Sequence, residues 1–183
     1  MKFIRKFIGK LLLKIGGWKM VGDVPKDDKY VCIIAPHTSF RDIFVGKLYN
    51  WANNMKPVIM VKKEFFFFPI SCIIKRWGAI PVDRKKTKNI VEQMADYFRQ
   101  KDKMLLAITP EGTRSLVKEW KTGFYRIAEA AKVPIYLSFI DFKTKTVGFL
   151  ERATVTGNMK SDIDMIKQKY QGMVGFIPSK FSV

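Results

Sequence analysis

The chain has 183 residues, which suits one domain and is long enough to bury a substantial core. Its 48% hydrophobic and 14% aromatic content argues against an intrinsically disordered chain. The formal net charge of +18 favours a polyanionic partner such as nucleic acid, anionic lipid headgroups or an acidic carrier protein.

The first residues predict an amphipathic helix that Gly16 and Gly17 end. Basic residues surround one apolar face, and no acidic residue precedes Asp23. Such a helix lies in the headgroup region of an anionic membrane, or it packs its apolar face on the domain. The surplus of cations favours the membrane, so we expect residues 1–17 to be a membrane-associating helix and residues 18–183 the folded domain. The apolar face consists of Phe3, Ile4, Phe7, Ile8, Leu11, Leu12 and Ile15.

The rest of the chain alternates between short apolar runs and amphipathic stretches. This order is typical of a single α/β domain with a largely parallel central sheet flanked by helices. The expected strands are 18–21, 30–35, 57–61, 79–82, 104–108, 134–141, 147–150 and 154–156, and the expected helices are 43–51, 66–77, 87–101, 123–131 and 162–170.

Cysteine usage and apolar run lengths indicate a cellular location. Cys32 and Cys72 lie in apolar stretches and are expected to be buried, reduced thiols. Without paired cysteines, and with a single histidine, the sequence argues against a zinc site. The longest apolar run, Phe65 to Ile74, is too short to span a bilayer. We expect a peripheral protein on the cytoplasmic face of the cell membrane.

One candidate catalytic pair follows the strand expected at 30–35. His37 stands at the carboxyl end of this strand, where open α/β sheets place their sites. Thr38 or Ser39 is expected to cap the next helix, which brings Asp42 beneath the imidazole. A carboxylate on one ring nitrogen prepares the other to accept a proton, so the pair predicts deprotonation of a hydroxyl. Taken alone, this pattern favours a buried structural histidine.

A second candidate segment, TPEGTRS, follows the strand expected at 104–108. Pro110 and Gly112 predict a turn that presents Glu111, Thr113 and Arg114 from the same sheet edge. Arginine suits bidentate recognition of phosphate, and Glu111 either orients Arg114 or contacts a substrate hydroxyl. An ordinary surface loop is the alternative.

Two more cations follow expected strands. Arg84 comes after the strand at 79–82 in the segment GAIPVDRKK, where it is a second candidate ligand for the same phosphate. Lys63, after the strand at 57–61, adds positive potential or is simply solvated. The aromatic run Phe65 to Phe68 lines an acyl groove, dips into lipid or belongs to a core helix.

The combination of these segments resembles the glycerophospholipid acyltransferase family, most closely its 1-acylglycerol-3-phosphate (lysophosphatidic acid) branch. Order and spacing agree as well as residue type, from about Tyr30 to Ile140. Pro36 stands where the family often has Asn, and Thr109 where it often has Phe. The matching segments are His37-x4-Asp42, Gly78-Ala-Ile-Pro-Val-Asp-Arg84, Pro110-Glu-Gly-Thr-Arg114 and Val133-Pro-Ile135.

The resemblance implies an enzyme that moves a fatty acyl chain from acyl-CoA or acyl carrier protein to 1-acylglycerol-3-phosphate. The product is phosphatidic acid, an intermediate of phospholipid biosynthesis, and neither a metal nor a resident cofactor is implied. His37 is then the general base and Asp42 orients it. The segment Val133 to Ile135 belongs to the sheet near the acyl site. Arg84 and the turn of Glu111, Gly112, Thr113 and Arg114 bind the acceptor phosphate.

The sequence does not identify the donors to the reaction's oxyanion, and backbone amides near the turn PHTSF are one candidate. Three alternatives remain open at this stage. In the first alternative, the acceptor is another lysophospholipid or a lyso-aminolipid. In the second alternative, the chain is a non-catalytic basic module that binds membrane or nucleic acid. The aromatic residues are not interleaved with Lys and Arg, which argues against nucleic acid. In the third alternative, a hydrolase, His37 activates Ser39 or Cys72, but the chain has no G-x-S-x-G segment.

Overall fold

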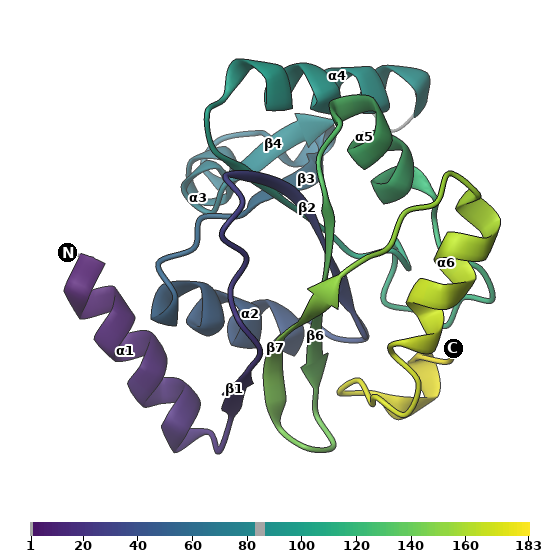
Figure 1. The fold of residues 1–183 in the computed structure, drawn as a ribbon. Coiled ribbons are helices and arrows are strands. Elements are labelled where there is room, and N and C mark those ends of the chain that lie inside the picture. Colours follow the sequence, from purple (N-terminus) through teal and green to yellow (C-terminus); the bar gives the residue numbers. More distant parts are fainter. Residues whose placement is uncertain (1, 83–86) are drawn as a thin grey trace.

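A computed structural model of the chain describes residues 2–82 and 87–183 (Figure 1). Within them, seven strands form one sheet in the order β1-β7-β6-β2-β5-β3-β4. Neighbouring strands are parallel except β6 and β7, which are antiparallel, so the predicted largely parallel α/β domain is confirmed. The strands are β1 Lys19–Val21, β2 Lys29–Ala35, β3 Val58–Lys62, β4 Ala79–Val82, β5 Met104–Ile108, β6 Ile135–Asp141 and β7 Thr146–Arg152.

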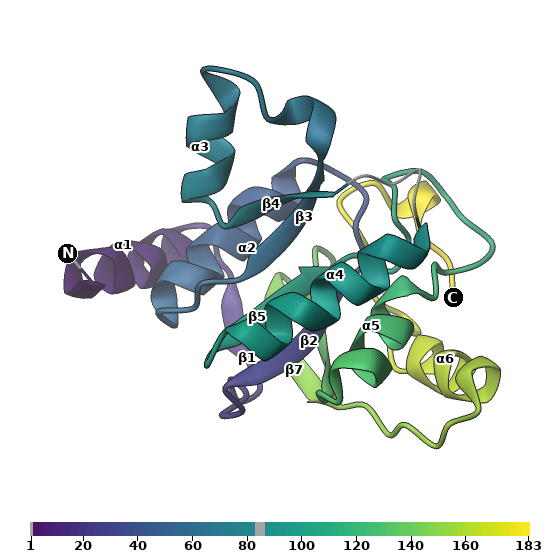
Figure 2. The same cartoon turned by 90° about the horizontal axis from the view of Figure 1, so that it is seen from above.

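Helices cover both faces of the sheet (Figures 1 and 2). One face carries α4, α5 and α6, and the other carries α1 and α2. The helices are α1 Lys2–Ile15, α2 Arg41–Ala52, α3 Ile70–Arg76, α4 Thr87–Gln100, α5 Gly123–Ala131 and α6 Met159–Gln168, and the 3-10 turns are η1 Lys63–Phe65 and η2 Pro178–Lys180.

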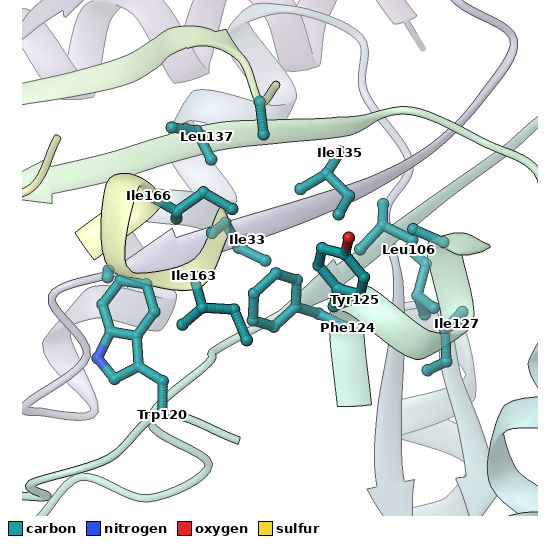
Figure 3. Close-up of a cluster of buried hydrophobic side chains, with 14 of the residues drawn as sticks. Ile33, Leu106, Trp120, Phe124, Tyr125, Ile127, Ile135, Leu137, Ile163 and Ile166 are labelled. Atoms are coloured by element: carbon teal, nitrogen blue, oxygen red, sulfur yellow. The ribbon is translucent and has the colours of Figure 1, made fainter. Parts of the chain in front are cut away.

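The apolar run of strand β2 is continuous because helices cover both faces of the sheet there. Val31 and Ile33 face the core beneath α4, α5 and α6, whereas Tyr30 and Cys32 face α1 and α2. Successive side chains of a strand point to opposite faces, so a strand covered on both sides is apolar at every position. In Figure 3, aromatic side chains of α5 and isoleucines of α6 pack against Ile33 and its neighbours on the sheet.

The chain after β6 differs from the prediction. One strand, β7, replaces the two expected at 147–150 and 154–156, and it forms a hairpin with β6. The connection includes Lys145 at φ 50°, which suits a tight turn. Residues 154–156 make no strand because Asp162 of α6 binds them: Thr156 donates its backbone N–H and its hydroxyl to that carboxylate, at 2.8 and 2.7 Å.

The helix expected at 66–77 is shorter and is not part of the core. It begins only at Ile70, because Pro69 disfavours helical geometry in the residue before it. No residue of α3 is buried, so the interpretation as a core helix is wrong. Cys72 on α3 is exposed, contrary to the expectation, whereas Cys32 is buried as expected.

Helix α1 packs on α2 through the side opposite its apolar stripe. Gly9 and Leu13 are its buried residues, and a Cβ added at Gly9 would lie 2.6 Å from the backbone of Ala52. The two helix backbones therefore touch. On the far side, Phe3 and Phe7 are 89% and 66% exposed, so the alternative in which the apolar face packs on the domain is wrong. No helix in the described part of the chain has the length and apolarity that a bilayer span requires.

The close approach at Gly9 predicts a matched pair of stability effects. Gly9→Ala should lower the free energy of unfolding by about 1–3 kcal/mol, because the new methyl group meets backbone that moves only with its helix. Gly46→Ala in α2 should be neutral or stabilising by about 0.5–1 kcal/mol, since the nearest atom lies 3.9 Å from its Cβ. Urea denaturation measures both values. Equal stability of the two variants would contradict the described crossing.

Candidate active site

The predicted site segments meet along one edge of the sheet. Strands β2, β5 and β3 are parallel neighbours, so the loops that follow them emerge at the same edge. His37 follows β2, the turn from Thr109 to Arg114 follows β5, and Lys63 follows β3. Neighbouring strands lie about 4.8 Å apart, so the first two loops are adjacent and the third is about 10 Å from the first.

Asp42 binds both the imidazole and the loop that carries it. Its Oδ2 lies 3.0 Å from Nδ1 of His37, and it accepts the backbone N–H groups of Thr38 at 2.8 Å and Ser39 at 3.0 Å. The predicted pairing of His37 with Asp42 is thus present in the structure. Asp42 is buried in the first turn of α2. One carboxylate oxygen therefore fixes the ring and the backbone on either side of it.

The helix cap agrees with the prediction for Ser39 and not for Thr38. Phe40 occupies the cap position of α2 and makes no side-chain cap, but the hydroxyl of Ser39 accepts the backbone N–H of Arg41, the first residue of α2, at 3.2 Å. Asp42 also reaches back to the loop amides from within the helix. Thr38 instead accepts the backbone N–H of Ile177 on its hydroxyl, at 3.1 Å.

The second ring nitrogen of His37 is the reactive one in this geometry. The Asp42 carboxylate accepts from Nδ1–H, which fixes the tautomer with an unprotonated Nε2. No described residue hydrogen-bonds Nε2, and the side chain of His37 is 18% exposed. The arrangement suits removal of a proton from a substrate hydroxyl.

Glu111 was predicted to contact a substrate hydroxyl or to orient Arg114, but its contact in the structure is a different one. Its two carboxyl oxygens accept the backbone N–H of His37, at 3.1 and 3.0 Å. The side chain is 2% exposed. Burial raises the pKa of Glu111 to about 8; the charge of Asp42 raises it further and the His37 amide opposes the rise. Glu111 thus holds the backbone of the histidine from the neighbouring strand.

These contacts occupy the amides that were one candidate for the oxyanion donors. The backbone N–H groups of His37, Thr38 and Ser39 all donate to the carboxyl groups of Glu111 and Asp42. The hypothesis that this turn supplies oxyanion donors is therefore wrong for these three amides.

The turn after β5 presents Arg114 at the predicted sheet edge, and the structure brings this side chain to the start of α2. Gly112 has φ +67°, and its N–H donates to Thr109 at 3.0 Å. The guanidinium of Arg114 lies 3.5 Å from the centroid of the Phe40 ring, a cation–π contact that fixes the charge two residues before Asp42. Gly112 and Thr113 are exposed at the tip of the turn.

Other predicted site residues are not brought to His37. Lys63 is exposed in η1, and no described contact joins it to the histidine. Arg84 lies outside the described residues. The Val133 to Ile135 segment is at the opposite edge, because Ile135 pairs with Val31 near the start of β2. At about 3.3 Å per residue this is roughly 20 Å from His37.

A C-terminal segment that the sequence did not suggest supports the site loop. A Cβ added at Gly175 would lie 2.5 Å from the side chain of Thr38, so only glycine fits there without a shift. The ring of Phe176 lies 4.1 Å beneath the guanidinium of Arg41. These residues lie outside the sequence segments that resemble the acyltransferase family, and no local sequence pattern identifies them.

The chain belongs to the Acyltransferase family, whose family model matches residues 20–138. The matched region is well over half of the chain and includes His37, Asp42 and the turn from Glu111 to Arg114. The predicted class of enzyme, an acyltransferase, is thereby confirmed. A comparison with curated protein sequences gives no significant match.

A solved structure shares the fold. It is the 1-acyl-sn-glycerophosphate (LPA) acyltransferase PlsC from Thermotoga maritima, which superposes with a TM-score of 0.61. The superposition covers 92% of this chain and 77% of that chain, at 16% sequence identity. At this identity the likeness establishes the fold alone.

The raised pKa of Glu111 predicts a pH-dependent stability. A carboxyl group with a pKa near 8 when folded and 4.5 otherwise binds its proton more tightly in the native state. Its stabilisation is complete below the lower value and is lost as pH rises through the higher one. The melting temperature should therefore fall more between about pH 5 and pH 9 in the wild type than in Glu111→Gln. Exposed Glu119→Gln is the matched control, and a Glu111→Gln slope equal to the control's contradicts the assignment.

Proposed function

We propose that the protein transfers a fatty acyl chain from acyl-CoA or acyl carrier protein to the free hydroxyl of 1-acylglycerol-3-phosphate, giving phosphatidic acid. The observation that carries this proposal is the 3.0 Å contact between Nδ1 of His37 and Oδ2 of Asp42, beside the Arg114 guanidinium. Membership in the Acyltransferase family and the fold shared with an LPA acyltransferase support it.

The chemistry follows from the orientation of the ring. Nε2 of His37 accepts the proton of the acceptor hydroxyl while the hydroxyl oxygen attacks the carbonyl carbon of the thioester. Asp42 stabilises the imidazolium that forms, through the hydrogen bond at Nδ1. The tetrahedral intermediate then expels the donor's thiolate, which takes the proton from the imidazolium. The products are an ester and a free thiol, and His37 returns to its starting form.

Binding of the acceptor phosphate falls to the cations at the same sheet edge. Arg114 is held against Phe40 and remains partly exposed, so its N–H groups can donate to phosphate oxygens. Lys63 and Arg84 follow the next strands of the sheet, and in this proposal they add positive potential for the acceptor or for the phosphates of CoA. Binding energy from the phosphate would place the hydroxyl at Nε2.

The proposed place of action is the surface of an anionic membrane on the cytoplasmic side. Both substrates carry acyl chains, and α1 exposes the apolar stripe that contains Phe3 and Phe7. Lysines on the flanks of this stripe lie where anionic headgroups would meet them. Because α1 packs on α2 and α2 carries Asp42, a membrane-bound α1 keeps the site close to its lipid substrate.

An acceptor panel tests the proposed reaction. Purified protein with acyl-CoA or acyl carrier protein should convert 1-acylglycerol-3-phosphate to phosphatidic acid, followed by mass spectrometry. His37→Ala should reduce turnover by roughly 10²–10⁴-fold, because the general base is lost. Circular dichroism of the variant controls for folding.

The panel also separates the acceptors. Monoacylglycerol, which lacks the phosphate, should react poorly if the cations bind that group. Transfer to another lysophospholipid or a lyso-aminolipid in preference to 1-acylglycerol-3-phosphate would keep the chemistry and replace the acceptor. Wild-type turnover in His37→Ala would contradict the proposed mechanism.

Vesicle binding tests the role of α1. The double variant Phe3→Ser/Phe7→Ser should bind phosphatidylglycerol vesicles at least about tenfold more weakly, since two exposed aromatic side chains are lost from the lipid contact. Its fold should be intact because neither residue is buried. Val155→Ser/Met165→Ser, which removes exposed apolar side chains near α6, is the matched control. Equal affinities of the two double variants would exclude α1 as a membrane contact.

A further inference from the structure

A second exposed apolar surface lies between β3 and β4. It is the segment from Phe65 to Trp77, called here the 65–77 segment, and it consists of the last residue of η1, the residues around Pro69, α3 and Trp77. Phe68 is 83% exposed, and α3 buries none of its residues. Figure 2 shows α3 projecting from the body of the domain. The exposed large apolar side chains of the segment are Phe65, Phe67, Phe68, Ile70, Ile73 and Trp77.

Cations flank these aromatic and aliphatic side chains. Lys62 and Lys63 come just before the run of phenylalanines, and Lys75 and Arg76 end α3. Glu64 is the single acidic residue in this stretch of sequence. Aromatic rings beside lysine and arginine are the composition of segments that lie at the boundary of an anionic membrane. A complementary protein surface would have to be both apolar and acidic.

The 65–77 segment is connected to the other exposed apolar surfaces. Nζ of Lys47 on α2 lies 5.7 Å from the ring centroid of Trp77. Burial, and then the nearby charge of Arg5 on α1, lower the pKa of Lys47, so α1 and α3 both approach α2 around this residue. One turn earlier on α2, Ile43 and Phe44 are 41% and 66% exposed. Arg5 of α1 and Trp77 at the end of α3 thus both approach Lys47, and the exposed α2 residues one turn earlier directly follow Asp42.

We propose that the 65–77 segment is a second membrane contact, separate from α1, which inserts its phenylalanine side chains among the headgroups of an anionic bilayer. The inference rests on the proposed membrane location of the protein and adds a second point of attachment to it. Two contacts at different elements fix the orientation of the domain, whereas a single helix leaves it free to rotate about that helix. With both contacts in place, the start of α2 and its His37–Asp42 pair stay beside the lipid.

Cys72 provides a natural probe for this contact. It is exposed on α3, whereas Cys32 is buried and burial raises the pKa of that thiol to about 12, so a thiol-reactive dye labels Cys72 selectively. An environment-sensitive fluorophore on Cys72 of the full chain should shift to shorter wavelength with phosphatidylglycerol vesicles and much less with phosphatidylcholine vesicles. Brominated acyl chains should quench it.

A variant comparison completes the experiment. Phe67→Ser/Phe68→Ser should weaken vesicle binding by about tenfold relative to Val155→Ser/Met165→Ser. Its turnover with detergent-dispersed substrates should equal the wild type's. In Phe3→Ser/Phe7→Ser the fluorophore should still shift once enough vesicles are present, because the second contact does not depend on α1.

Four results would overturn the proposal, and each has a different consequence for the proposed function and membrane location. Protein that sediments with vesicles while the fluorophore stays unchanged binds through α1 alone. Lost turnover of Phe67→Ser/Phe68→Ser in detergent places these residues at the acyl-chain site. A shift that depends on protein concentration without vesicles indicates self-association. Absence of any vesicle binding also removes the proposed location, while acyl transfer in detergent still decides the proposed reaction.

Discussion

A single oxygen atom, Oδ2 of Asp42, accepts hydrogen bonds from the imidazole of His37 and from the next two backbone amides of the loop. The position in the first turn of α2 suits a carboxylate, because the helix N-terminus carries partial positive charge. Glu111 takes the remaining amide, that of His37, from the end of β5. The loop between β2 and α2 is thus held by two acids, one in the first turn of α2 and one in the turn after β5. This explains how a short irregular segment keeps the ring in one orientation.

Two buried carboxyl groups so close together carry an electrostatic cost. Burial and the charge of Asp42 raise the pKa of Glu111 to about 8, so near neutral pH this acid is largely protonated. A neutral Glu111 still accepts the His37 amide and does not repel Asp42. Oδ1 of Asp42 is buried without a hydrogen-bond partner in the described residues, which adds to the strain of the arrangement. The two acids thus have separate structural tasks: Asp42 binds the imidazole and two loop amides, and Glu111 binds the His37 amide.

Sequence patterns predicted the sheet and the pairing of His37 with Asp42, because both depend on local periodicity and on the order of strands. They did not predict the bond from Glu111 to the His37 amide, since that contact depends on how deeply the β5 turn is buried. The support from Gly175 and Ile177 to Thr38 was also missed, because contacts across most of the chain leave no local pattern. For α1, the pattern identified the apolar stripe correctly, but the side that packs is determined by Gly9 and Leu13, outside the stripe.

The pairing of β1 with β7 has a consequence for the order in which the protein is made. Lys19 of β1 pairs with Thr146 of β7, so the strand that attaches α1 to the sheet has no partner until most of the chain has been synthesised. Contacts between distant parts of a sequence form late, whereas a helix forms locally and fast. During translation α1 therefore emerges with its apolar stripe well before the sheet that will hold it. Under the proposed membrane attachment, a nascent chain with such a helix would reach the lipid surface while still attached to the ribosome, and the domain would then fold at that surface.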